Sequence, residues 1–88
     1  MKKVTVTVES QSGFHARPAS ILVAKAQEFE SEIFIEKAGA EINAKSIIGI
    51  LGLGVSYLDE IIVSCTGVDE DKAIDAIKTL IEEDLKHQ

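Results

Sequence analysis

The sequence predicts an α+β fold, an open-faced sandwich in which helices cover one face of a four-stranded antiparallel sheet. Strand and helix patterns follow one another along the 88 residues in the order βαββαβα. The first strand alternates strictly between apolar and polar residues, which is typical of an antiparallel sheet with one buried face and one face in water. An apolar content of 45% is enough for one core, and we expect a single domain over residues 1–88.

The first strand and the first helix follow from their periodicities. Residues 4–8 alternate valine with threonine, which predicts a strand buried on one side. A polar loop over residues 10–13 follows it. From Pro18 onward, apolar residues recur at helical spacing, which predicts an amphipathic helix. Its buried stripe comprises Ala19, Leu22, Val23, Ala26 and Phe29.

A hairpin and a short apolar helix are expected next. Residues 31–37 predict a second strand with Ile33 and Ile35 on one face, and Ala38-Gly39 can turn it into a short strand through Ile42. Residues 45–55 are apolar on every side and contain three glycines. We expect a short helix with an irregular exit there.

The last strand and the last helix complete the pattern. Residues 59–66 predict the strand. Asp69 can cap the final helix, Glu70 and Asp71 suit the positive end of its dipole, and Lys86 suits the other end. The buried stripe of this helix comprises Ile74, Ile77, Leu80, Ile81 and Leu85.

The composition excludes several classes of partner. A net charge of −6 would repel a phosphodiester backbone, and the lysines form no basic stripe, so we expect no direct contact with nucleic acid. No apolar stretch approaches the roughly 20 residues that span a bilayer. No signal-peptide pattern is present, and the single cysteine, Cys65, fits a reducing compartment. We therefore expect a cytoplasmic protein without membrane insertion, in which Cys65 is a buried structural thiol.

The residues with the most chemistry lie together before the first helix. The segment His15-Ala16-Arg17-Pro18 holds the only arginine, the only proline and one of two histidines. An imidazole can act as a nucleophile, a guanidinium can bind phosphate, and the free N–H groups of a helix start favour an anion. Two helix starts are possible: Pro18 can be the first helical residue with Arg17 as the cap, or His15 can be the cap.

Each residue of this cluster also has an ordinary explanation. A loop histidine is more often solvated than reactive, and a single arginine is usually a surface residue. The adjacency of imidazole, guanidinium and helix start exceeds what capping or solubility requires, and it favours a site for a phosphoryl group. His87, near the end of the sequence, is expected to be solvated and incidental.

The segment Gly13-Phe14-His15-Ala16-Arg17-Pro18-Ala19-Ser20 resembles the active-site motif of the HPr family, the histidine-containing phosphocarriers of the bacterial phosphoenolpyruvate:sugar phosphotransferase system. Residues 43–54 resemble the second motif of that family, and the length and element order agree. The resemblance implies that phosphorylated enzyme I transfers a phosphoryl group to Nδ1 of His15. The group then passes to sugar-specific enzyme II components, the enzyme IIA domains, for sugar uptake.

The resemblance also implies roles for the neighbours of His15. Arg17 and the backbone N–H of Ala16 would stabilise the moving phosphoryl group. His15 would be a relay without independent turnover, and neither a cofactor nor a metal is expected. A relay that presents one site to successive partners is best served as a monomer.

Ser46 supports two compatible interpretations. From the residues alone, it is a natural N-cap for the short apolar helix. The resemblance is to the Gram-positive type of the family, which implies that an ATP-dependent serine kinase/phosphorylase modifies Ser46. The serine-phosphorylated form would then be a corepressor for a catabolite-control transcription regulator.

The short helix also offers a docking surface. Isoleucine and leucine at helical spacing are usually core residues. A segment that is apolar on every side cannot bury all of them in so small a domain, so we expect part of it to remain exposed. The resemblance assigns Ile47, Ile48 and Leu51 to the binding of enzyme I and the regulators.

Two alternatives remain open at this point. One is a purely regulatory paralogue that binds a transcription regulator without carrying phosphate. Relatives of that type lack the active-site histidine, so His15 argues against it. The other is a small domain with no role in phosphotransfer.

Overall fold

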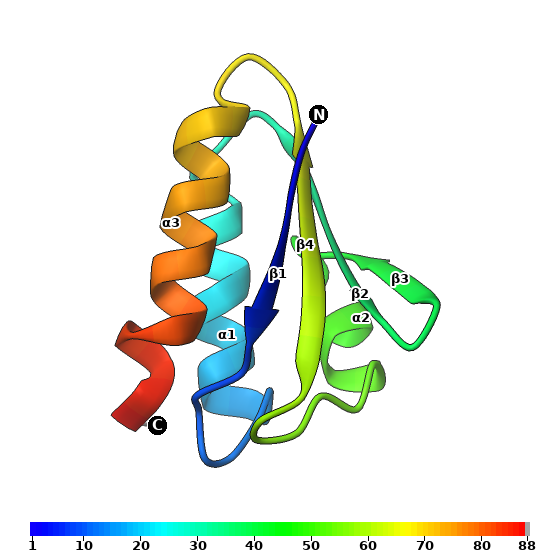
Figure 1. Ribbon diagram of the computed structural model, residues 1–88, viewed down its shortest axis with the longest axis vertical. Helices are drawn as coiled ribbons and strands as arrows, with labels where there is room; N and C mark the ends of the chain where they lie inside the picture. The colour runs from blue at the N-terminus through cyan, green and yellow to red at the C-terminus, as the bar shows by residue number, and fades with distance from the viewer. Residues whose placement is uncertain (88) are drawn as a thin grey trace.

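The helices and strands follow the predicted order. A computed structural model describes residues 1–87, and Figure 1 shows their arrangement. The elements are β1 (Lys2–Thr7), α1 (Ala16–Ala26), β2 (Glu32–Lys37), β3 (Ala40–Asn43), α2 (Ile47–Gly52), β4 (Glu60–Thr66), α3 (Glu70–Glu82) and a closing 3-10 turn, η1 (Asp84–His87).

The four strands form one antiparallel sheet in the order β1-β4-β2-β3. Val63 of β4 lies opposite Val4 of β1 on one side and opposite Ile35 of β2 on the other. This register places the apolar residues of three strands on one face. Helix α3 packs against β1 and β4, while α1 contacts both α3 and α2. The predicted open-faced sandwich is confirmed.

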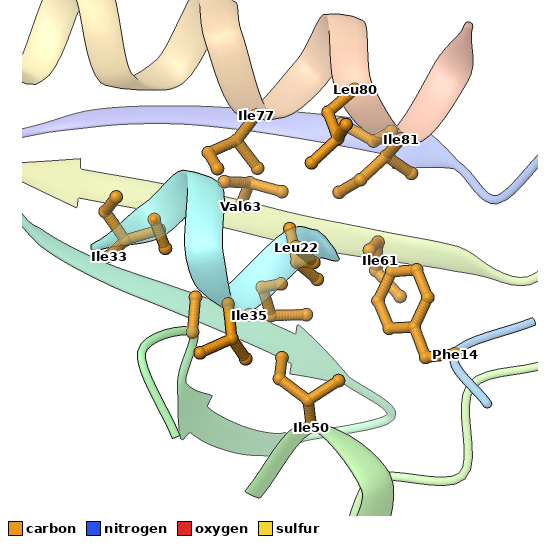
Figure 2. Close-up of a cluster of buried hydrophobic side chains, with 14 of the residues drawn as sticks. Phe14, Leu22, Ile33, Ile35, Ile50, Ile61, Val63, Ile77, Leu80 and Ile81 are labelled. Carbon is orange, nitrogen blue, oxygen red and sulfur yellow. The ribbon is translucent and has the colours of Figure 1, made fainter. Parts of the chain in front are cut away.

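The core lies between this face of the sheet and the helices. Figure 2 shows the side chains of the sheet, α1 and α3 pointing toward one another. Complete burial of one such leucine or isoleucine contributes about 1.5–3 kcal/mol to folding. The largest fully buried side chains are Val6, Val8, Leu22, Ile33, Ile35, Ile50, Ile61, Val63, Cys65, Ile77, Ile81 and Leu85.

The opposite face of the sheet is open. Glu32 and Phe34 alternate with buried Ile33 and Ile35, as the sequence predicts, and they remain exposed or half-buried.

Cys65 is buried in the inner face. Burial raises the pKa of its thiol to about 11, and the nearby carboxylates add to that effect. The thiol is therefore uncharged at neutral pH, as expected of a structural cysteine.

Helix α1 ends earlier than its apolar stripe suggests. It stops at Ala26, because from Glu28 onward the N–H groups bond to carbonyls only three residues back: Glu28 to Lys25 at 3.1 Å and Phe29 to Ala26 at 3.2 Å. Phe29 therefore follows the helix, and its half-buried ring still packs against the core. None of the helices within residues 1–87 is both long and apolar enough to cross a membrane.

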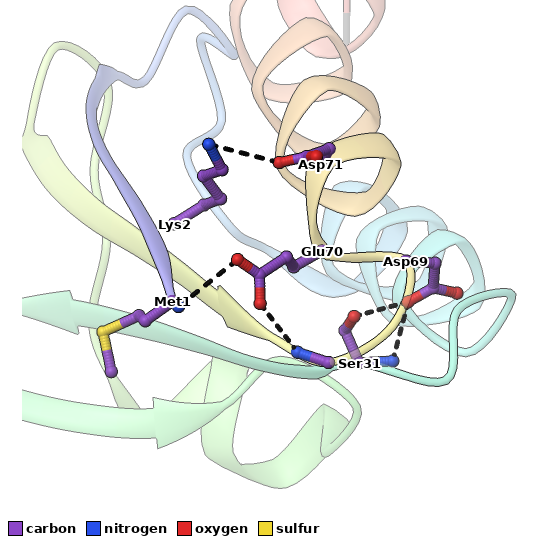
Figure 3. A network of polar contacts seen from close by, with 7 residues as sticks. Met1, Lys2, Ser31, Asp69, Glu70 and Asp71 are labelled. Atoms are coloured by element: carbon purple, nitrogen blue, oxygen red, sulfur yellow. Dashed lines mark hydrogen bonds and ion pairs between the residues drawn. The ribbon is translucent and has the colours of Figure 1, made fainter.

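The start of α3 differs from a simple capped helix. Asp69 holds the cap position as expected, but its side chain makes no cap hydrogen bond. Its carboxylate instead accepts hydrogen bonds from the N–H groups of Glu30 and Ser31, each at 2.9 Å, and from the Ser31 hydroxyl. Figure 3 shows this contact between the α3 start and the segment before β2. The residue expected to act locally therefore joins two distant parts of the chain.

Candidate functional site

His15 is the N-cap of α1. Its backbone is extended, with φ −72° and ψ −179°, and Ala16 is the first helical residue. Of the two helix starts that the sequence allows, the structure has the one with the cap at His15, and Pro18 is the third residue of the helix. The imidazole makes no cap hydrogen bond, and the residue is exposed. The side chain is therefore open to an approaching protein.

The helix start beside His15 offers donors to an anion. The N–H of Ala19 bonds to the carbonyl of His15 at 2.8 Å, which is the first bond of the helical ladder. Pro18 has no N–H, so the N–H groups of Ala16 and Arg17 are the ones left without an intrahelical partner. They lie at the positive end of the helix dipole, where negative charge is favoured.

The Arg17 guanidinium adds a positive charge in the first turn of α1, two residues after the cap. Arg17 is exposed, and it takes part in none of the ion pairs found within residues 1–87. A guanidinium that is not committed to a protein carboxylate can bind a phosphoryl group with two parallel hydrogen bonds. The structure thus places imidazole, guanidinium and free N–H groups at one helix end, as the sequence predicts.

The chain leading to His15 is held by its backbone. The N–H of Phe14 donates to the carbonyl of Val55 at 3.1 Å, and the Phe14 ring is only 3% exposed. Gly13 has φ +62°, and a Cβ at this position would lie 2.3 Å from the Val55 carbonyl oxygen. His15 is therefore anchored on one side by the Val55 segment and on the other by α1.

Ser46 caps α2, as predicted. Its side-chain oxygen accepts a hydrogen bond from the N–H of Gly49 at 3.1 Å, and the residue is exposed. An N-cap bond of this kind satisfies a backbone donor that would otherwise lack a partner in the helix. The hydroxyl is thus structural and also accessible from solvent.

The three apolar residues of α2 that the sequence singled out are all at the surface. Ile48 is 81% exposed, Leu51 45% and Ile47 36%, whereas Ile50 is fully buried. Helix α2 contacts α1, and α2 lies in the lower half of the molecule in Figure 1, as the start of α1 does. The exposed residues Ile47, Ile48 and Leu51, here called the α2 patch, are therefore on an element that adjoins α1.

Two charged residues that contact the loop after α2 belong to no motif in the sequence. The Lys37 ammonium lies 2.9 Å from the Asp59 carboxylate and donates to the carbonyl of Gly54 at 2.6 Å. These residues lie 22 positions apart, so no motif links them. Only the register of β2 and the path of the loop after α2 bring them together. Within residues 1–87, no group of three or more His, Cys, Asp or Glu side chains could hold a metal ion.

Comparison with known proteins gives this site its context. The family model described as "PTS HPr component phosphorylation site" matches residues 2–83. The chain belongs to the HPr family. The resemblance seen in the sequence is confirmed, and members of the HPr family are phosphocarriers of the phosphotransferase system rather than catalytic enzymes.

Curated HPr relatives match over nearly their full length. The phosphocarrier protein HPr of Mycoplasma pneumoniae is 44% identical over 89 residues, covering 100% of this chain and 98% of that protein. The HPr-like protein Crh of Bacillus subtilis is 36% identical, covering 97% of this chain and 100% of Crh. The family therefore includes both proteins named as phosphocarriers and proteins named as HPr-like.

Solved HPr structures share the fold closely. An HPr from Thermoanaerobacter tengcongensis superposes with a TM-score of 0.95 at 43% identity, covering 100% of this chain and 99% of that one. A chain of an HPr dimer from the same organism gives a TM-score of 0.77 at 45% identity, covering 97% and 98%. The fold assigned from the pattern of strands and helices is thus the fold of HPr.

Proposed function

We propose that this HPr-family protein accepts a phosphoryl group on His15 from phosphorylated enzyme I and passes it to sugar-specific enzyme IIA domains for sugar uptake. The observation that carries this proposal is the exposed His15 cap beside the N–H groups of the α1 start and beside Arg17, which forms no ion pair within residues 1–87. The membership of the chain in the HPr family supports the same role.

The proposed transfer uses few groups of this chain. The lone pair of His15 Nδ1 attacks the phosphorus atom carried by enzyme I, a new N–P bond forms, and the bond between that phosphorus and enzyme I breaks. Charge on the phosphoryl oxygens is stabilised by the Arg17 guanidinium and by the N–H of Ala16. The reverse sequence on the next protein returns His15 to its free state, so the chain has no independent turnover.

The α2 patch is the proposed docking surface for these partners. Exposed apolar residues on a helix that adjoins α1 can bury against another protein while the phosphoryl group moves. Enzyme I, the enzyme IIA domains and the regulatory partners would use Ile47, Ile48 and Leu51 in turn. Because one exposed site serves them all, we infer that residues 1–88 act as a single domain and a monomer, in the cytoplasm.

Ser46 is the proposed regulatory site. An ATP-dependent serine kinase/phosphorylase would phosphorylate it, and the product would bind a catabolite-control transcription regulator. The hydroxyl is exposed and lies directly before the α2 patch, so a phosphate there would change which proteins the patch accepts. The match to the HPr-like protein Crh, a relative described in one solved structure as a catabolite repression protein, supports a regulatory role within the family.

Phosphoenolpyruvate-dependent labelling tests the relay. The wild-type protein, incubated with enzyme I and phosphoenolpyruvate, should gain one acid-labile phosphate. His15→Ala should gain none, whereas His87→Ala, which changes an exposed histidine in η1, should be labelled as the wild type is. Equal labelling of His15→Ala and wild type would show that His15 is not the acceptor.

A further inference from the structure

The loop between α2 and β4 is tied to the end of β2 by one lysine. The Lys37 ammonium donates to the Gly54 carbonyl at 2.6 Å and pairs with the Asp59 carboxylate at 2.9 Å. Asp59 in turn accepts a hydrogen bond from the N–H of Ser56 at 2.8 Å. Lys37 therefore contacts both ends of the segment Gly54–Asp59, and Asp59 closes that segment on itself.

The same loop supports the residues that precede His15. The carbonyl of Val55 accepts the N–H of Phe14 at 3.1 Å. The backbone of Val55 and Ser56 lies so close to Gly13 that no Cβ would fit there. A shift of this loop would therefore move the chain directly before His15.

The Lys37–Asp59 contact is held in place by several groups. Both side chains are about 70% shielded from solvent, with exposures of 28% and 31%. The hydrogen bond from Lys37 and the bond from the Ser56 N–H hold the pKa of the Asp59 carboxyl below its usual value. A carboxylate that is ionised and bonded twice restricts the loop more than an exposed ion pair does.

The protein contains a natural comparison for this pair. The Lys78 ammonium and the Glu82 carboxylate form an ion pair of similar length, 2.8 Å, but they are neighbours on the surface of α3. Their contact joins two positions of one helix and fixes no loop. An effect that appears at Lys37 and not at Lys78 would thus come from the connection between β2 and the loop.

We propose that Lys37 and Asp59 are positioning residues for His15, acting through Val55 and the Phe14 N–H. The pair fixes the Gly54–Asp59 loop, the loop fixes Gly13 and Phe14, and His15 is thereby presented at the angle that an in-line transfer needs. Transfer between two proteins depends on such alignment, because small displacements of a reacting atom reduce the rate strongly. The inference rests on the proposed relay function.

The experiment compares Lys37→Met and Asp59→Asn with Lys78→Met. With these variants as substrates, the kcat of enzyme I should be at least about fivefold lower for Lys37→Met and Asp59→Asn than for the wild type. The KM of enzyme I for them should be nearly unchanged, because the α2 patch is intact. Lys78→Met should react like the wild type. Lys37→Arg, which keeps a donor for both Asp59 and Gly54, should recover most of the rate.

Hydrogen exchange of the Phe14 amide measures the same connection without phosphotransfer. This exchange should be several-fold faster in Lys37→Met and Asp59→Asn than in the wild type, while core amides of β4 exchange as before. Unchanged kcat and unchanged Phe14 exchange in both variants would overturn the inference alone. A wild-type protein that takes no phosphoryl group would overturn the relay function and, with it, this inference.

Discussion

At the residue scale, Gly13 shows how closely the site is built into the fold. Its φ of +62° is a conformation that residues with a Cβ adopt at a cost, and the Val55 carbonyl occupies the space that a Cβ would fill. Glycine is thus favoured at this position by the backbone angle and required there by the contact with Val55. Gly13 lies in the segment that leads to His15.

Gly13→Ala should destabilise the protein by more than Gly39→Ala. Gly39 also has a positive φ, +86°, but nothing lies within 4 Å of its missing Cβ. Gly39→Ala should therefore lower the free energy of unfolding only by the cost of the backbone conformation, about 1 kcal/mol. Gly13→Ala should lower it by roughly a further 1–3 kcal/mol, because the loop at Val55 must move. Urea unfolding measures both values, and equal losses would contradict the contact described at Gly13.

The candidate site shows which residues can be read from the sequence. His15, Arg17 and Ser46 are visible because each lies at a helix start, where local chemistry identifies it. Lys37 and Asp59 are not, because their contact depends on the path of a loop and not on spacing. A salt bridge between distant segments leaves no periodic signal in one sequence.

At the element scale, the apolar alternation of β1 and β2 and the apolar run of residues 61–63 in β4 predict the strands of the sheet. The register then follows from the need to bury one face of each strand. Helix boundaries were harder. The stripe of α1 continues to Phe29, yet the helix ends at Ala26, because a ring can pack against the core from the turn that follows a helix. An apolar stripe reports burial, and burial does not require helical backbone.

Labelling by a kinase tests the proposed regulatory site, Ser46, at the start of α2. With ATP and a cognate kinase, the wild type should gain an acid-stable phosphate and Ser46→Ala should gain none. Ser20→Ala is the matched control, because Ser20 is also exposed but its hydroxyl donates to the Ala16 carbonyl within α1. It should be labelled normally. Labelling of Ser46→Ala at the wild-type level would exclude Ser46 as the kinase site.

Ser46→Ala should also weaken the protein slightly in the absence of any kinase. The variant removes the bond from the Gly49 N–H to the serine oxygen, and loss of an N-cap costs about 1 kcal/mol. Ser20→Ala removes a hydroxyl that bonds back into its own helix, where no capping donor depends on it. Thermal unfolding of the two variants separates the capping role of Ser46 from its regulatory one.

At the scale of the whole molecule, one end of the sheet carries the candidate site and the other end carries a polar network that holds α3. The start of α1, which His15 caps, and the α2–β4 loop lie at the lower end in Figure 1, and the β4–α3 loop and the N-terminus lie at the upper end. At the upper end, the Glu70 carboxylate accepts the N–H of Gly67 at 3.1 Å and pairs with the Met1 amino group at 3.3 Å. Asp69 binds the Ser31 segment beside it (Figure 3). This network holds α3 to the sheet without using any group of the His15 site.

The network makes stability depend on acid. The Ser31 hydroxyl, followed by the Glu30 N–H, holds the pKa of the Asp69 carboxyl below its usual value. In the unfolded chain that carboxyl has a pKa of about 3.9. Below that pH the unfolded state binds a proton that the folded state does not. The stabilisation is therefore complete above about pH 4 and is lost as the pH falls through the folded-state pKa.

Asp69→Asn should remove this dependence. Its free energy of unfolding should be lower than that of the wild type at pH 7 and should fall less steeply below about pH 4, because there is no carboxylate to protonate at position 69. Some slope should remain, since hydrogen bonding to the Gly67 N–H also holds the pKa of Glu70 below its usual value.

Asp75→Asn, on the exposed side of α3, controls for the change in net charge. Denaturant unfolding at a series of pH values measures the three curves. Parallel curves for wild type and Asp69→Asn would mean that Asp69 is not held in its ionised form by Ser31. Phosphorylation of His15 should be unaffected at neutral pH, because α3 is held to the sheet at the end opposite the site.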